Sequence, residues 1–289
     1  MVAAEARVNL PLTRSRPKRP FPTLVVAIGV ITAAAVLVSV ISVKAKWSRL
    51  LDGPDAFWRI VKLVVDEWQW SDLGTCVREM WVSVAIAWVG TLLAAGVAIP
   101  LSFMAAENLV PRWWSFAIKQ VFNALRAVPD LVLVIALVPI FGLRTMAGVV
   151  AIAIGSIGTL AKLSSELIEA IDRGPVEAVD AVGATSLQRL RWSVVPQVAP
   201  EITSFVLYRF EINIRISAVL GAIGAGGIGR VLRDNIEYDN WGIAGMALCT
   251  VILATVAIDT ISGIVRRRIV AGPDRMPVNE GAILEVSMP

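Results

Sequence analysis

Six residues, GAGGIG at positions 224–229, have the glycine spacing G-x-G-x-x-G that can cradle the pyrophosphate of a dinucleotide cofactor. That chemistry needs a β-strand before the glycines, a helix after them and an acidic residue about 20 positions later. The stretch instead follows an apolar segment of helical length, so no strand–helix–strand unit can be built around it. We therefore interpret it as a turn that needs positive φ angles and close backbone approach, with glycines at Gly224, Gly226, Gly227 and Gly229.

Charged residues within apolar segments form a second group of interest, because ionisable side chains are costly in a membrane and usually face a polar interior or one another. Two opposite-charge pairs are four residues apart, Lys162 with Glu166 and Glu211 with Arg215, so each pair shares one helix face. We expect two intramembrane ion pairs. They either brace the bundle or line a polar route through it.

Several classes of chemistry are excluded by residues that the sequence lacks. There is no histidine, and the two cysteines, Cys76 and Cys249, form no C-x-x-C, which excludes His-based triads and metal sites built on His or paired Cys. No G-x-x-x-x-G-K-[ST] phosphate loop is present, so any ATP must be bound by another chain. We expect no metal and no cofactor on this chain.

The elements that must position these residues are membrane spans. The chain is 56% hydrophobic with a mean hydropathy of +0.71, above the roughly 45–50% apolar usage of globular proteins. A helical span needs about 20 mostly apolar residues. The sequence therefore predicts an all-α integral membrane protein with six transmembrane helices, near residues 23–43, 79–104, 117–141, 146–168, 201–225 and 242–264.

Basic residues beside the spans predict the orientation. Arg14, Arg16, Lys18 and Arg19 precede the first span and the run 266–268 follows the last, which favours cytoplasmic termini. The charge of +4 and pI near 9.4 are explained by this topology better than by nucleic-acid binding. The predicted parts are a cytoplasmic tail (1–22), an anchor (23–43), an extracytoplasmic segment (44–78), a permeation core (79–265) and a cytoplasmic tail (266–289).

Two consequences of this topology concern the cysteines and the first connection. Cys76 is expected on the extracytoplasmic side and Cys249 is expected to be buried in the sixth span. Residues 55–70 have apolar side chains at helical spacing with interleaved charges, and are too short and too charged to span. They predict an amphipathic helix between spans one and two, which lies either in the membrane interface or packed on the bundle.

Between spans four and five lie about thirty polar residues, 171–201, with the composition of helices. Pro175 is placed where a helix can start, Pro196 where one should stop, and Gly183 lies between them. We predict two short helices bent at Gly183, on the cytoplasmic side. An ordinary connection is the alternative, but a connection in a bundle needs only about 2–8 residues.

This segment resembles the EAA loop of the permeases of ATP-binding-cassette (ABC) importers. EAVDAVG followed by RWSVVP puts Glu177, Ala178, Gly183 and Pro196 on that motif, with Val179, Ser193 and Val195 as departures. Residues 125–135, 158–178 and 207–229 are similar to the permeases of phosphonate-type importers, and the resemblance covers about residues 20–270.

The resemblance implies a type I ABC importer permease that pairs with a second copy of itself in the lipid membrane. It implies docking of two ATPase subunits, which bind ATP and Mg²⁺, on the EAA loops, and delivery of substrate by an extracytoplasmic binding protein. The expected substrates are phosphonate-like oxyanions. Alternatives are an importer of another small solute, such as an inorganic oxyanion or an amino acid, an ion-coupled secondary transporter, and a membrane enzyme.

An anionic substrate should meet positive potential along its route. Arg126 is favoured over Arg215, because Glu211 lies one turn from Arg215. Pro129, three residues after Arg126, can kink the third span. The pathway candidates are Arg126, Pro129, Asn213 and Arg215.

Overall fold

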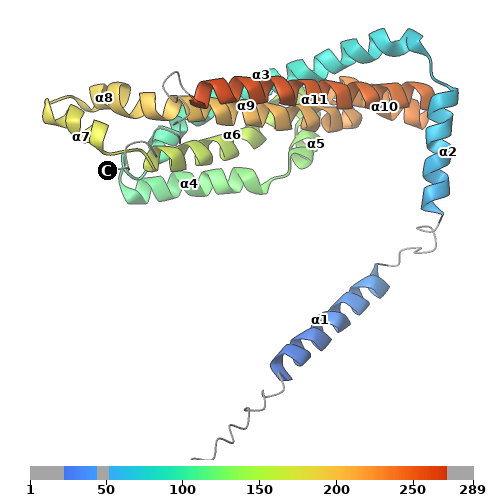
Figure 1. The fold of residues 1–289 in the computed structure, drawn as a ribbon, viewed down its shortest axis with the longest axis horizontal. Coiled ribbons are helices and arrows are strands. Elements are labelled where there is room, and N and C mark those ends of the chain that lie inside the picture. The colour runs from blue at the N-terminus through green and yellow to red at the C-terminus, as the bar shows by residue number, and fades with distance from the viewer. Residues whose placement is uncertain (1–22, 44–51, 272–289) are drawn as a thin grey trace, which may run out of the picture. The chain divides into compact units, whose positions relative to one another are not determined.

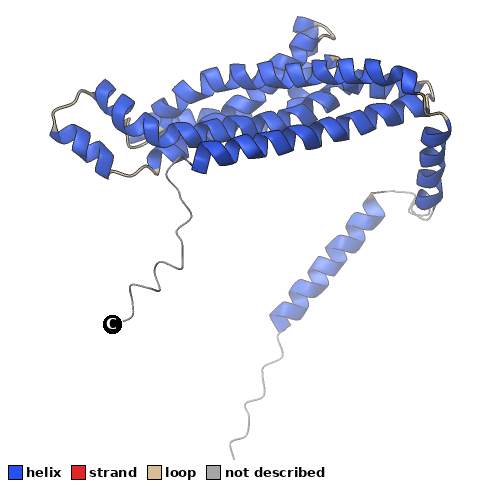
Figure 2. Ribbon diagram, turned by 45° about the horizontal axis from the view of Figure 1, so that its top comes forward, coloured by secondary structure: helices blue, strands red, loops and turns tan. Residues whose placement is uncertain are grey.

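The computed structural model describes residues 23–43 and 52–271, and all regular elements in these ranges are helices (Figure 2). Four helices are long and apolar enough to span a membrane, and the number rises to six if each of two bent helix pairs makes one span. The four are α1 (Thr23–Ser42), α3 (Leu73–Ala105), α6 (Thr145–Glu169) and α11 (Trp241–Ala271). The predicted all-α membrane fold is confirmed.

The described residues fall into two units, divided after Trp58. In the first unit, α1 matches the predicted anchor at residues 23–43, has no charged residue and exposes apolar side chains all around, among them Val30, Ile31 and Leu37. A helix that is apolar on every face is typical of a membrane span. The basic residues Arg14, Arg16, Lys18 and Arg19 lie outside the described residues.

The core of the second unit is a bundle in which α3 packs along α6 and against α9 (Val195–Leu220), and α9 packs on α11 (Figure 1). Alanines of α3, including Ala94 and Ala98, pack against Leu160 and Ala161 of α6. Small side chains of this kind let helix backbones approach closely, which is how helices associate in lipid.

The predicted third span is not one helix. It consists of α4 (Arg112–Ala127) and α5 (Asp130–Phe141), whose axes are bent by 85°. The break falls at Val128, which has an extended backbone, and Pro129, because the proline ring disfavours helical geometry in the residue before it. Pro129 therefore caps a new helix rather than kinking a continuous one.

The GAGGIG segment is a turn, as predicted. The π-helical turn η4 (Gly221–Ala225) ends the α9 segment, and α10 (Ile228–Glu237) follows at an angle of 55°. Three of the four glycines have positive φ, 116° at Gly224, 82° at Gly226 and 73° at Gly227. At Gly229, a Cβ atom would overlap the carbonyl oxygen of Ala218. Glycine is thus required for conformation at three positions and for space at the fourth.

The helix predicted over residues 55–70 is α2 (Gly53–Asp66), which has one apolar and one charged face. Just beyond it, Glu67 Oε2 accepts a hydrogen bond from the Trp241 backbone N–H at 3.1 Å, where α11 begins. This contact joins the end of the α2 segment to the start of the last helix.

The predicted burial of Cys249 is wrong, and Cys76, which was predicted on the extracytoplasmic side, is buried within the bundle. Cys76 lies inside the first turns of α3 and is completely buried against Met80 and Met246, because α3 begins six residues before the predicted span. Cys249 of α11 is exposed on the outer surface of the bundle. A helix pattern alone did not indicate which face of α11 packs inward.

We therefore predict that Cys76 resists a membrane-impermeant maleimide in intact membranes and reacts only after denaturation in dodecyl sulfate. Its thiol has no exposed surface to attack. Labelling by mass shift, with a Cys249→Ala variant to leave one thiol, measures this. Rapid labelling of Cys76 in the native membrane would contradict the packing of α3.

Candidate functional site

Two short helices, α7 (Gly174–Ala181) and α8 (Ser186–Arg189), project from one end of the bundle (Figure 1). Pro175 lies in the first turn of α7, where its missing N–H costs nothing. Gly183, with φ of 77°, ends α7: its N–H donates to the Asp180 carbonyl, and the next N–H donates to the Val179 carbonyl. This is the Schellman pattern of a helix terminated by glycine. The predicted bend at Gly183 is confirmed.

The predicted helix stop at Pro196 is wrong. A π-helical turn, η3 (Leu190–Val194), continues α8 into α9, and Pro196 lies in the first turn of α9. In a regular α-helix the proline ring would clash with the carbonyl four residues earlier, and a wider π turn is one way to relieve that clash. The second loop helix is therefore continuous with the predicted fifth span.

The two ends of the loop are held together by Gln197 of α9. Its side-chain oxygen accepts from the Asp172 N–H at 3.1 Å, and its Nε2 donates to the Asp172 carbonyl at 3.3 Å. Across the loop, Arg189 Nη1 lies 3.3 Å from Asp180 Oδ2. The Thr185–Gln188 capping box starts α8. The loop is a defined structure rather than a loose connection.

The outer surface of this loop is apolar as well as charged. Glu177 and Ala178 are exposed, and three large apolar side chains nearby are 81%, 74% and 66% exposed, at Val182, Leu187 and Trp192. Exposed apolar patches next to charged residues are typical of protein–protein contacts. Beside them, a cleft of about 310 Å³ between α7, α8 and the α3–α4 turn has Glu177 on its wall.

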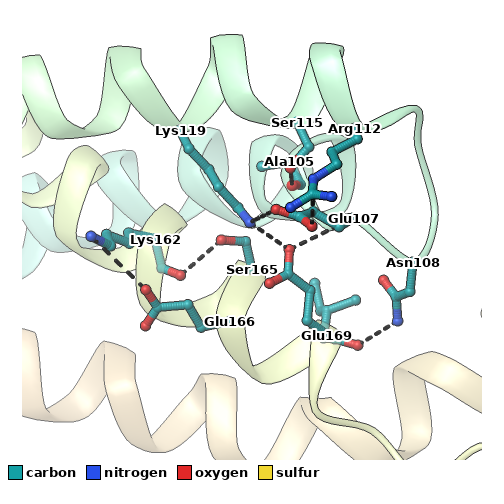
Figure 3. A network of polar contacts seen from close by, with 11 residues as sticks. Ala105, Glu107, Asn108, Arg112, Ser115, Lys119, Lys162, Ser165, Glu166 and Glu169 are labelled. Atoms are coloured by element: carbon teal, nitrogen blue, oxygen red, sulfur yellow. Dashed lines mark hydrogen bonds and ion pairs between the residues drawn. The ribbon is translucent and has the colours of Figure 1, made fainter.

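A charged network fixes the root of the loop, where α6 ends (Figure 3). Lys119 of α4 lies 2.8 Å from Glu169, near the end of α6, and 3.1 Å from Glu107 in the α3–α4 turn. The Glu107 N–H also donates to Glu169 at 2.8 Å, and Asn108 Nδ2 donates to the Ile168 carbonyl at 2.8 Å. Helices α4 and α6 and the α3–α4 turn are thereby joined just before the loop begins.

The predicted ion pairs have different outcomes. Lys162 Nζ lies 3.9 Å from Glu166. Glu211 and Arg215, by contrast, each pair with α11: Glu211 with Arg266 at 3.3 Å, and Arg215 with Asp259 at 2.9 Å. The pairing of Glu211 with Arg215 is thus wrong, because the packed neighbour helix offers each side chain an opposite charge.

A polar cluster at the meeting of α3, α6 and α9 includes the predicted pathway residue Asn213. Asn213 is fully buried, and its Nδ2 donates to Thr91 Oγ1 at 2.8 Å and to Ser156 Oγ at 3.0 Å. Ser156 Oγ also accepts from Arg209 Nε at 2.9 Å. On its other side, Arg209 Nη2 lies 3.8 Å from Asp130 Oδ2 at the start of α5.

Sequence reasoning missed both Arg209 and Asp130. Asp130 is four residues after Arg126, yet it pairs with Arg209, because the helix break at Pro129 separates it from α4. Arg126 itself is exposed in the last turn of α4. Two features of the sequence could have indicated this pair: Arg209 lies within an apolar span, and Asp130 directly follows Pro129. Within residues 23–43 and 52–271, no group of three or more His, Cys, Asp or Glu could hold a metal ion.

The structure is a helical bundle with candidate membrane spans and a structured, protruding loop. Residues 98–271 match the family of inner membrane components of binding-protein-dependent transport systems, and the chain belongs to that family. It is a multi-pass permease subunit, and ATP hydrolysis in this class occurs on separate chains.

Individual relatives agree with the predicted branch of the family. HtxC of Stutzerimonas stutzeri, assigned as a phosphite transport system permease protein, is 31% identical over 92% of this chain and 94% of its own length. The phosphate-import permease protein PhnE of Mycolicibacterium smegmatis is 35% identical over 93% of this chain, which spans 51% of PhnE. The resemblance to phosphonate-type permeases is confirmed.

Solved structures agree on the fold. An inward-facing structure of the MetNI methionine ABC transporter superposes with a TM-score of 0.60 at 19% identity, covering 70% of this chain and 99% of that chain. The predicted type I importer fold is therefore confirmed.

We predict that Lys119→Met lowers the free energy of unfolding by about 1–2 kcal/mol, because Glu107 and Glu169 would lose the cation that lies between them and only the longer contact of the exposed Arg112 with Glu107 would remain. Thermal unfolding of the purified protein in detergent measures the change. The matched control is Lys162→Met, whose contacts with Glu166 at 3.9 Å and Asn123 at 3.3 Å are longer and more exposed and predict a loss of roughly 0.5 kcal/mol or less. Equal effects of the two variants would contradict a special role for the network.

Proposed function

We propose that this permease imports phosphonate-like oxyanions, which include phosphonates, phosphite and phosphate. The observation that supports this most is the similarity to a phosphite permease over nearly the whole of both chains. A buried guanidinium within the bundle is in keeping with an anionic substrate. Arg126, Pro129 and Arg215 remain pathway candidates within the proposal.

The α7–α8 loop is, in this proposal, the docking site of an ATPase subunit that binds ATP and Mg²⁺. Glu177, Ala178, Gly183 and Pro196 lie on the EAA motif within it. The exposed side chains of Val182, Leu187 and Trp192 support the proposal, since a docked partner would cover them. The loop then lies in the cytoplasm, and so do both termini.

The assembly that we propose has two copies of this chain, two ATPase subunits and an extracytoplasmic binding protein. A relative of about twice the length, of which this chain spans 51%, supports pairing of two permease units. In the same orientation, the glycine turn 224–229 and α10 lie at the outer end of the bundle. The amphipathic α2 would lie in the lipid interface, with its apolar face toward the acyl chains.

The loop proposal predicts different effects for two substitutions of Gly183. A Cβ atom there meets no neighbour within 4 Å, so the positive φ is what restricts the residue. Asn tolerates that conformation, whereas a β-branched Val is strained by about 1–2 kcal/mol. We expect Gly183→Asn to retain ATPase copurification and uptake, and Gly183→Val to lose both while still inserting in the membrane. Equal copurification of the two variants would count against the loop as the docking element.

The test of function uses the complete complex in proteoliposomes, with the binding protein outside and ATP inside. We expect uptake of radiolabelled methylphosphonate, phosphite or phosphate that requires ATP and persists when ionophores collapse ion gradients. The control complex has the phosphate-loop lysine of the ATPase replaced by alanine. Uptake without ATP, or uptake of amino acids but not of these oxyanions, would overturn the proposal.

A further inference from the structure

We propose that the Arg209 guanidinium binds the transported oxyanion within the bundle, and that the Asp130 carboxylate takes the anion's place when no substrate is bound. This inference rests on the proposed function and assigns the substrate contact to a residue pair. Neither residue belongs to the ATPase-docking loop.

The Arg209 guanidinium is buried but incompletely hydrogen-bonded, as expected of a group that binds a ligand. A purely structural charge would have closer partners. Its side chain is only 13% exposed, a position in which a guanidinium is costly unless its donors are used. In the described part of the chain, Nε makes a hydrogen bond, to Ser156, while Nη2 lies 3.8 Å from Asp130. That distance is too long for a hydrogen bond. The outer edge of the guanidinium therefore faces an anion without a tight contact.

Asp130 reaches this position because residue 155 of α6 has no side chain. A Cβ atom on Gly155 would overlap Asp130 Oδ1. The carboxylate side chain is 24% exposed, so the pair lies at an accessible edge of the cluster rather than at its sealed centre. Asp130 is also in the first turn of α5, where the helix dipole stabilises a negative charge.

The remaining polar residues orient Arg209 and do not compete for the anion. Ser156 Oγ accepts from Arg209 Nε and from Asn213 Nδ2, which occupies both of its lone pairs. Asn213 is in turn held by Thr91, and all three of these side chains are completely buried. Asn213, predicted as a pathway residue, is therefore a positioning residue in this arrangement. Its amide fixes the serine that directs the guanidinium outward.

Exchange of one anion for another matches the needs of transport. A phosphonate or phosphate offers tetrahedral oxygens that can accept two parallel hydrogen bonds from a guanidinium. Because Asp130 returns as the substrate leaves, Arg209 never lacks a counter-charge, and the net gain on binding stays small. A permease must release its substrate, so weak binding of this kind is useful. Arg215 is less suited, since its 2.9 Å contact with Asp259 is already tight.

The experiment uses the assembled complex in proteoliposomes and four variants, Arg209→Gln, Arg209→Lys, Asp130→Asn and, as the control, Arg267→Gln, which replaces an exposed arginine of α11. Copurification of the ATPase and basal ATP hydrolysis report assembly. We expect Arg209→Gln to assemble normally and to reduce maximal methylphosphonate uptake about tenfold or more. Arg209→Lys should restore part of that uptake, and Arg267→Gln should remain within about twofold of the parent.

A direct binding measurement separates substrate contact from a structural role. Radiolabelled phosphate retained by the detergent-solubilised complex, without binding protein, should rise about tenfold in Asp130→Asn, because no carboxylate competes for Arg209, and vanish in Arg209→Gln. Parent-level uptake by Arg209→Gln, or unchanged phosphate retention by Asp130→Asn, overturns the inference while leaving oxyanion import intact. If the parent complex imports no oxyanion at all, the proposed function fails and this inference fails with it.

Discussion

A polar group in an apolar bundle must find its partner inside the protein, and the arrangement of the second unit follows from that requirement. In lipid, water cannot satisfy a stranded amide, hydroxyl or charge, so each such group selects the neighbouring helix that can. Asn213 ties α9 to α3 and α6 through Thr91 and Ser156, and Glu211 ties α9 to α11 through Arg266. Polar interior residues of α9 thus bind it to three neighbouring helices.

The same requirement explains how the bundle tolerates its irregular segments. At Pro129, η3 and η4, some backbone N–H and C=O groups lose their regular helical hydrogen bonds. In lipid these groups need other hydrogen-bond partners within the protein. At the glycine turn, the Ile228 N–H donates to Ser83 Oγ of α3 at 3.1 Å, and Glu79 of α3 lies 3.6 Å from Arg230. One turn of α3 therefore receives both the freed backbone and the first charge of α10. Irregular backbone occurs where a packed helix supplies its partners.

Sequence patterns predicted those features that depend on neighbours along the chain. The first apolar helix, the proline start of α7 and the glycine end of α7 are local features, and the structure has them where they were expected. Features that depend on the neighbouring helix were missed. The spacing of Glu211 and Arg215 predicted a bridge within α9, but α11 supplies a closer charge to each. The burial of Cys76 and the exposure of Cys249 likewise depend on which faces meet, which a helix period does not specify.

Arg209 and Asp130 were missed because a helix break brings them together, and residue spacing in the sequence does not reveal that break. Along an unbroken third span, Asp130 would lie one turn from Arg126 and would neutralise it. The 85° break at Pro129 instead turns Asp130 toward α6 and α9. Arg209 in turn lies on a helix that is continuous through η3 with the protruding loop at one end and reaches the glycine turn at the other. A displacement of the loop would therefore move the Arg209 guanidinium relative to the Asp130 carboxylate, since α5 belongs to a different helix pair. The helix that positions the Arg209 guanidinium is thus continuous with the protruding loop.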